Sequence, residues 1–173
     1  MMESEQFILH QKDWVPNNER LPVIVYRGAV KAEGKEAAEA FERMFADHGW
    51  PPQWRYGIYD FHHYHTEGHE VLGVASGQAR LMLGGPDGLV LEVCAGDVLL
   101  LPAGTGHCNL ESSDDFLVVG AYPPGQHADI CREAPGAALL QAIDTLPFPD
   151  QDPVQGAHGA VSEYWSKGKI SNS

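Results

Sequence analysis

The stretch that decides the fold is "GIYDFHHYHTEGHEVLGVASG" (57–77), which holds four histidines and two glutamates. His63 and His65 are separated by one residue, so both imidazoles lie on the same face if this part of the chain is an extended strand. Glu70 begins the next apolar run and follows the turn-forming "TEG" after one intervening residue, His69. The residues alone therefore indicate two imidazoles that converge on one ion, with Glu70 as a candidate carboxylate ligand from a neighbouring strand.

A second glycine-rich segment, "GDVLLLPAGTGH" (96–107), follows after an intervening pair of apolar runs and ends at His107. In the first segment, five residues separate Gly57 from His63, one separates the two histidines, four precede Glu70 and six precede Gly77. In this order and at this spacing, the two segments resemble the two sequence motifs of the cupin superfamily. The text between them and the tail "DPVQGAHG…YW" resemble the small bacterial YjlB-like cupins.

The resemblance implies an all-β fold, the cupin double-stranded β-helix or jelly roll, with a metal ion bound inside it. The ligands that it implies are His63, His65, Glu70 and His107. Three neutral imidazoles and one carboxylate suit one divalent transition metal ion, namely Fe, Mn, Ni, Co, Cu or Zn. One or two coordination positions would stay open for water or substrate, as in catalytic metal sites.

Three further residues near these ligands could hydrogen-bond to them or line the pocket. The cupin motif expects an asparagine where this chain has Glu111, but Asn109 has the same strand parity as His107 and still faces the metal side. His69 has the opposite parity from Glu70, so it faces away unless a bulge intervenes. It either replaces His65 or Glu70 as a ligand or supports the ligands and packs nearby.

The wall of the pocket is expected to be mainly apolar, because four residues share the inner face by parity: Tyr59, Phe61, Leu72 and Val74. Three side chains are eligible as an internal general acid or base: Glu92, Glu111 and Tyr122.

The rest of the chain predicts one domain over 1–173, made of N-terminal strands and a helix (1–53), the cupin barrel (54–122) and a wrapping tail (123–173). Apolar residues at helical spacing predict a helix over 34–50, and "FILH" and "LPVIVYRGAV" predict strands before it. A short helix is expected near 137–143. Short apolar runs with glycine punctuation predict the barrel strands: "WRYGIYDFHHYH", "EVLGVAS", "QARLMLGG", "LVLEVC", "DVLLLPAG", "HCNLES" and "FLVVGAY".

The composition excludes several classes of partner. The chain carries 24 acidic against 11 basic residues, a net charge of −13, which disfavours nucleic acid and anionic membrane surfaces. We expect a cytoplasmic protein with reduced thiols, because the start "MMESEQFILH" lacks the pattern of a secretory signal and the three cysteines show no metal or redox spacing.

Two classes of function remain open. One is a metal-dependent enzyme acting on a small organic molecule, with a dioxygenase-like oxidoreductase preferred and a cupin-type isomerase or decarboxylase as the alternative. The other is a non-catalytic module that binds a metal or a metabolite. The resemblance also suggests a homodimer in which "FILH" or "PVIVYRG" joins the partner's sheet.

Overall fold

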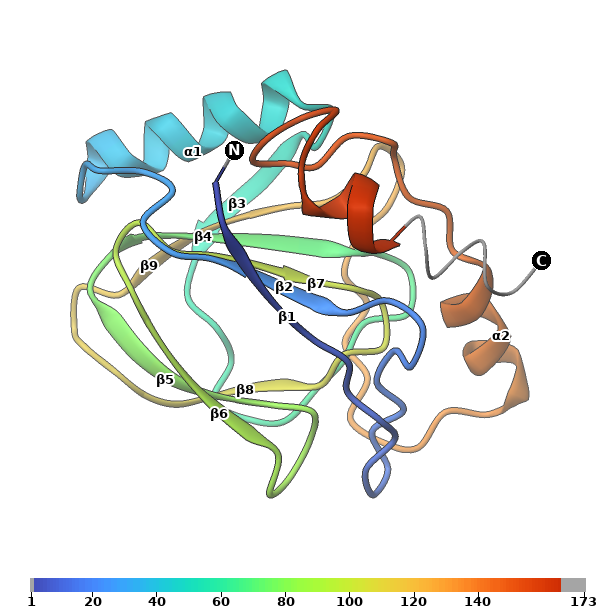
Figure 1. The fold of residues 1–173 in the computed structure, drawn as a ribbon. Coiled ribbons are helices and arrows are strands. Elements are labelled where there is room, and N and C mark those ends of the chain that lie inside the picture. The colour runs from blue at the N-terminus through green and yellow to red at the C-terminus, as the bar shows by residue number, and fades with distance from the viewer. Residues whose placement is uncertain (1, 166–173) are drawn as a thin grey trace.

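The computed structural model describes residues 2–165, and two antiparallel sheets dominate it (Figure 1). One sheet has six strands in the order β1-β2-β7-β4-β9-β3, and the other has three in the order β6-β5-β8. The strands are β1 (Ser4–Phe7), β2 (Val23–Tyr26), β3 (Pro52–Tyr56), β4 (Glu70–Ser76), β5 (Gln78–Leu83), β6 (Leu89–Cys94), β7 (Val98–Leu101), β8 (His107–Ser112) and β9 (Leu117–Ala121). The predicted all-β jelly roll is confirmed.

Two layers of core lie on the two faces of the six-stranded sheet, because successive side chains of a strand point to opposite faces. In β4, Leu72 and Val74 face the three-stranded sheet, whereas Val71 and Ala75 face the helix α1 (Lys35–Asp47). Glu70 shares the parity of Leu72, so it points into the space between the sheets. The expected inner face of this strand is therefore confirmed.

The helix α1 lies over the outer face of the six-stranded sheet (Figure 1). Three of its buried residues, Ala37, Phe41 and Phe45, lie on the apolar stripe that the spacing predicted, and Ala38 beside them is also buried. Ala40 and Met44, the other two residues of that stripe, are half-buried. Gly73 of β4 allows this close approach, because a Cβ there would lie 2.7 Å from the ring of Phe41.

The chain departs from the predicted strands at two places. The N-terminal strand is Ser4–Phe7 rather than "FILH", so the two share only Phe7. The run "WRYGIYDFHHYH" is a strand only to Tyr56, and the following segment is irregular up to β4. It is held instead by two isolated bridges, His63 with His107 and Tyr64 with Cys131.

The segment after β9 returns over the domain and contains α2 (Ala137–Thr145) and a π-helical turn, η1 (Val161–Trp165). Trp165 is buried in the same core as α1, and its indole N–H donates to the Pro22 carbonyl at 3.0 Å. The predicted single domain includes residue 1 and residues 166–173, which lie outside the described part, so it stays a prediction. Among residues 2–165, no helix is long and apolar enough to cross a membrane.

Asp152 anchors this segment to the sheet. Its carboxylate is fully buried and accepts hydrogen bonds from the Tyr26 hydroxyl at 2.7 Å and from the backbone N–H groups of Val154, Gln155 and Val161. Burial, together with the charge of Asp152, holds the pKa of Tyr26 far above its usual range, so the phenol remains a donor.

We expect Asp152→Ala to lower the free energy of unfolding by about 2–4 kcal/mol, because several buried donors lose their acceptor. Urea denaturation would measure this change. The matched control is Asp150→Ala, which removes an exposed carboxylate two residues away and is expected to change stability by less than about 0.5 kcal/mol. Equal stability of the two variants would contradict the anchoring role.

Candidate metal centre

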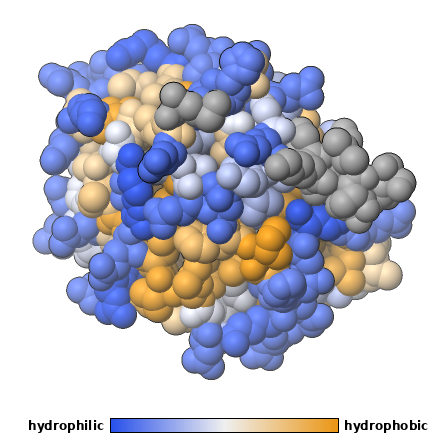
Figure 2. Space-filling model, viewed as in Figure 1, coloured by the Kyte–Doolittle hydropathy of each residue, from blue (hydrophilic) through white to orange (hydrophobic). Residues whose placement is uncertain are grey.

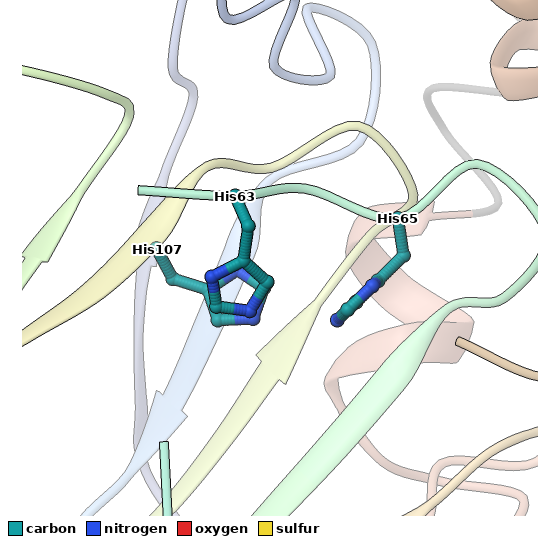
Figure 3. A group of neighbouring side chains, drawn as sticks. All are labelled: His63, His65 and His107. Atoms are coloured by element: carbon teal, nitrogen blue, oxygen red, sulfur yellow. The ribbon is translucent and has the colours of Figure 1, made fainter. Parts of the chain in front are cut away.

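Three buried histidines form a cluster at one end of the space between the sheets (Figure 3). His63 and His65 come from the irregular segment after β3, and His107 is the first residue of β8. Backbone hydrogen bonds in both directions join His63 to His107, at 3.2 and 2.9 Å, and fix their rings 4.1 Å apart between centroids. One nitrogen from each histidine lies within 4.8 Å of the others. His63 and His65 thus converge as their parity predicted, although the segment is no regular strand.

The Nδ1 atom of each clustered histidine faces a backbone carbonyl. His63 bonds to Phe61 at 2.9 Å, His107 bonds to Thr105 at 3.0 Å, and His65 bonds to Asp129. Because a carbonyl only accepts, each Nδ1 carries the proton, and in the neutral ring the Nε2 atom is left with an unshared electron pair. The backbone therefore sets the tautomer that a metal ligand needs.

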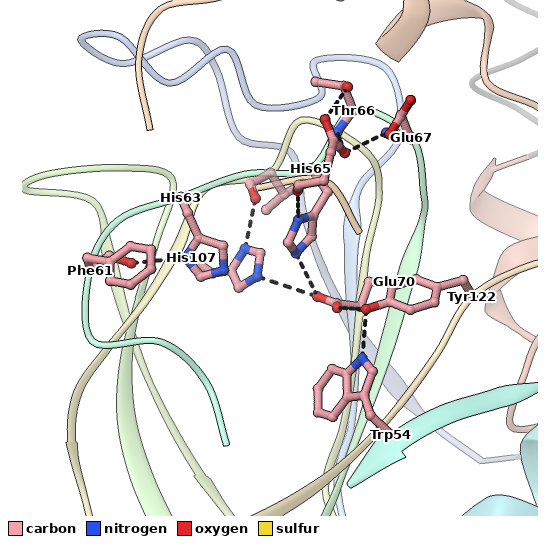
Figure 4. Close-up of polar contacts among 11 residues, drawn as sticks. Trp54, Phe61, His63, His65, Thr66, Glu67, Glu70, His107 and Tyr122 are labelled. Atoms are coloured by element: carbon pink, nitrogen blue, oxygen red, sulfur yellow. Dashed lines mark hydrogen bonds and ion pairs between the residues drawn. The ribbon is translucent and has the colours of Figure 1, made fainter. Parts of the chain in front are cut away.

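Glu70 brings a carboxylate to the same point from the six-stranded sheet (Figure 4). Its Oε1 atom lies 3.4 Å from Nε2 of His65 and 3.4 Å from Nε2 of His107. Its Oε2 atom accepts a hydrogen bond from the Tyr122 hydroxyl at 2.8 Å, and that hydroxyl accepts one from the Trp54 indole at 2.8 Å. One carboxylate oxygen is thus held by the protein, and the other faces the histidines.

The electrostatics of the cluster follow from this geometry. Burial alone would raise the pKa of Glu70, but the charge and hydrogen bonds of His65 and His107 outweigh it and hold that pKa well below its usual range. Burial alone would lower the pKa of His65, but the charge of Glu70 raises it. His63 differs, because burial and the neighbouring His107 lower its pKa to about 3. The cluster therefore favours one positive charge beside Glu70.

The donor set fits a divalent transition metal ion. Two ligands about 2.0–2.2 Å from one ion lie about 3–3.5 Å apart, and the Glu70 oxygen already has this spacing from two imidazole nitrogens. Nitrogen and carboxylate donors of this kind suit the first-row metals from manganese to zinc.

A cavity of about 500 Å³ opens onto the cluster. Its wall includes all four donor residues, Tyr122 and a largely apolar remainder: Gln53, Trp54, Arg55, Tyr56, Gly57, Ile58, Tyr59, Leu72, His127, Ala128 and Ile130. Trp54 lies directly on the backbone of Gly120, where a Cβ would come within 2.2 Å of the indole. This close approach places the indole N–H beside Tyr122.

Of the four residues that were predicted to line the pocket, two line the cavity and two lie behind its wall. Tyr59 lines the cavity and packs edge-on against His63 at 5.3 Å, and Leu72 also lines it. Phe61 stacks behind Tyr59 at 4.9 Å, and Val74 lies deeper, in the core between the sheets. The wall is thus mainly apolar, and the parity prediction is confirmed for Tyr59 and Leu72, whereas Phe61 and Val74 do not line the cavity.

Asn109 keeps the parity of His107, because these two residues pair with Leu81 and Leu83 of β5 in regular register, whereas Glu111 does not, because β8 has a register shift after Asn109. Leu81 of β5 pairs with Asn109, but the next residue back, Arg80, pairs with Glu111, which leaves Leu110 unmatched. Asn109 donates to the Ser112 hydroxyl at 3.0 Å. Glu111 is exposed and lies with Glu92 in a separate depression near Arg80, so of the three candidate acids and bases only Tyr122 reaches the cavity.

His69 is fully buried but lies outside the histidine cluster. Its Nδ1 atom accepts the Ala103 N–H at 2.9 Å, and its Nε2 atom faces the Leu146 carbonyl at 3.3 Å, so this ring has the opposite tautomer. Its ring packs against Phe148 and Trp165. Burial lowers its pKa to about 4, which keeps it neutral. The structure thus gives His69 a place between the β7–β8 turn and the returning segment.

Asp129 is a supporting residue that the sequence motifs did not indicate. Its carbonyl accepts from His65, and its carboxylate accepts from the backbone N–H groups of Thr66 and Glu67 at 2.7 and 2.9 Å and from the Thr66 hydroxyl at 2.6 Å. The residue follows β9 and lies 64 positions from His65 in the chain, and no local pattern marks it.

We expect His69→Ala to lower the free energy of unfolding by about 2–4 kcal/mol, because it leaves a cavity and two unpaired backbone groups. Binding of Co(II) to the histidine cluster, followed by visible absorption, should remain. Loss of Co(II) binding with unchanged stability in urea would instead make His69 part of the metal centre.

Comparison with known proteins gives one extensive match. The chain is 33% identical over 167 residues to the uncharacterized protein YjlB of Bacillus subtilis (strain 168), which covers 95% of this chain and 98% of that protein. A solved structure of oxalate decarboxylase shares 18% identity and a TM-score of 0.34, and the match covers 78% of this chain but only 32% of the other. No family model matches the sequence.

Proposed function

The chain belongs to the YjlB family of cupins, and from this premise we propose that it binds one divalent transition metal ion in the cavity. The proposed ligands are three imidazoles and one carboxylate: His63, His65, His107 and Glu70. The observation that carries the proposal is the convergence of unshared electron pairs. The three imidazoles hold their Nδ1 protons on carbonyls, and the Nε2 atoms of His65 and His107 lie 3.4 Å from one carboxylate oxygen, so a cation among them would be bound by every donor.

The metal would polarise a bound oxygen atom or activate dioxygen at its open coordination positions. The residues around it hold the carboxylate and limit access of water. Tyr122 donates to Glu70, Trp54 donates to Tyr122, and the apolar wall reduces the number of polar groups that can bind bulk water.

For the reaction we propose a dioxygenase-like oxidation of a small organic molecule. Isomerases and decarboxylases need an internal general acid or base near the substrate. Among the described residues of the cavity wall, Glu70 is the one carboxylate, and it is a proposed ligand. Burial and the charge of Glu70 raise the pKa of Tyr122 far above its usual range, so this phenol stays protonated: it cannot accept a proton and is a weak acid. These features favour oxygen chemistry over the alternative.

A homodimer in the cytoplasm is part of the same proposal. In the described part of the chain, β1 pairs only with β2 and is therefore a sheet edge, whereas β2 is paired on both sides and offers none. Figure 2 shows an apolar area over the region of β1 and β6. Exposed apolar side chains in this region are Ile8, Leu89 and Val90. A second copy of the chain could cover this area at the β1 edge.

We expect the protein, purified without a histidine tag, to contain about one equivalent of metal by elemental analysis. Loss of a residue that only supports a ligand reduces metal affinity by about 10- to 100-fold. His63→Ala and His107→Ala remove proposed ligands, so we expect them to reduce metal affinity by more than this. His62→Ala is the matched control, since His62 is adjacent but outside the cluster. Full metal occupancy in both ligand variants, with the fold checked by circular dichroism, would refute the site.

We expect the Fe(II)-loaded protein to consume dioxygen in the presence of a suitable apolar diol or diketone, and His107→Ala to lose this activity. An oxygen electrode combined with mass spectrometry of the products would measure it. Carbon dioxide release or isomerisation without oxygen uptake would favour the decarboxylase or isomerase instead. Stoichiometric binding of a metabolite without turnover would favour the non-catalytic module.

A further inference from the structure

The cavity has a polar inner end and an apolar mouth, and this division indicates what kind of molecule it binds. On the basis of the metal site proposed above, we propose that the ligand is an amphiphile: a monoanion with an oxygen-bearing head, such as a carboxylate, and an apolar body of several carbon atoms. The head would lie at the histidine cluster, and the body would follow the wall to the mouth.

The polar groups of the wall are concentrated at the buried end of the cavity. The four proposed metal ligands and Tyr122 are each at most 6% exposed. A divalent ion held by three neutral imidazoles and one carboxylate would keep one net positive charge. A head with a single negative charge would balance it, and this attraction is strong at a buried site.

Arg55 does not offer a second binding site for this head. In β3 it pairs with Val119, whose side chain lies in the core beneath α1, so the two side chains share that face of the sheet. The guanidinium accordingly donates to the carboxylate of Glu42 on α1, at 2.8 and 2.7 Å. An anionic head is therefore directed to the cluster and not to this arginine.

Between the cluster and the mouth the wall is apolar. Leu72 is buried, and Trp54 and Ile58 pack against the same core between the sheets. A polar group placed against these side chains would lose its hydration without gaining a hydrogen-bonding partner. Carbon atoms are the complementary surface, and the cavity volume of about 500 Å³ is sufficient for a small organic molecule.

Three apolar side chains from separate segments remain exposed around the mouth. Tyr56, Tyr59 and Ile130 all line the cavity, and they are 64%, 40% and 49% exposed. Tyr56 pairs with Val118, which lies in the core between the sheets, so its ring is on the cavity side of β3. Single apolar residues on a surface are ordinary, but a group of them at one pocket is buried only when a ligand covers it. The apolar body of the ligand therefore reaches the mouth.

The first test is a series of straight-chain monocarboxylates, namely butanoate, hexanoate and octanoate, titrated into the Co(II)-loaded protein by isothermal calorimetry. We expect affinity to rise about two- to fourfold for each added methylene, where fourfold corresponds to complete burial. Adipate has the length of hexanoate but a second carboxylate at its far end. It should bind at least about tenfold more weakly than hexanoate, because that charge would lie against the apolar wall. Equal affinities along the series, or adipate binding as tightly as hexanoate, would overturn the proposal.

The second test removes an apolar group from the mouth. Ile130→Ser should lower octanoate affinity at least about threefold and leave butanoate affinity unchanged, because only the longer chain reaches this residue. Leu140→Ser is the matched control, since Leu140 is 44% exposed but lies on α2, outside the cavity wall. An unchanged octanoate affinity in Ile130→Ser, or an equal loss in both variants, would refute the role of the mouth.

The metal-free protein separates this proposal from the proposed metal site. Titration with 1-butanol, 1-hexanol and 1-octanol should show the same dependence on chain length, because the apolar wall is present without a metal. Such a dependence in a protein that does not bind Co(II) would support the apolar body of the ligand and refute the metal site. Binding of Co(II) without any dependence on chain length would refute the amphiphilic ligand alone.

Discussion

The convergence of four donor atoms on one buried point is the constraint on which the site depends. The backbone carbonyls of Phe61, Thr105 and Asp129 fix the protons of three imidazoles on Nδ1, and this directs the unshared pairs of their Nε2 atoms inward. The carboxylate of Glu70 enters the same space from the other sheet. Such an arrangement costs free energy without a positive charge at its centre. The fold keeps the donors together because strand pairing and buried hydrogen bonds to residues outside the cluster fix the position of each donor side chain.

Much of that outside support comes from the segment after β9, which makes the segment part of the site rather than a mere cover. Asp129 holds the turn at Thr66 and Glu67 and also orients His65. Further along, Asp152 binds Tyr26 and fixes the chain against the six-stranded sheet. Stability of the returning segment and geometry of the donor set are therefore coupled, because displacement of the segment would remove the acceptor of His65.

The sequence was informative wherever spacing alone determines position. Glycines at turns and alternation along β4 were enough to predict the strand, its inner face and the direction of Glu70, and the separation of His63 from His65 predicted their convergence. The parity of Asn109 relative to His107 was predicted correctly, but that of Glu111 was not predictable, because a single unmatched residue, Leu110, shifts the register of β8 before it. Asp129 and the Trp54–Tyr122 pair were missed because their contacts join segments 52 to 68 residues apart or lie in a loop with no periodic pattern.

One chain of hydrogen bonds joins the cavity wall to the donor set. Trp54 lines the cavity with its indole ring and donates with its N–H to Tyr122, which in turn donates to Glu70. The backbone of Gly120 lies directly against this indole and restricts its position. A molecule that packs on Trp54 therefore contacts a group whose position fixes the carboxylate beside His65 and His107. Two hydrogen bonds thus connect the cavity wall to the carboxylate of the cluster.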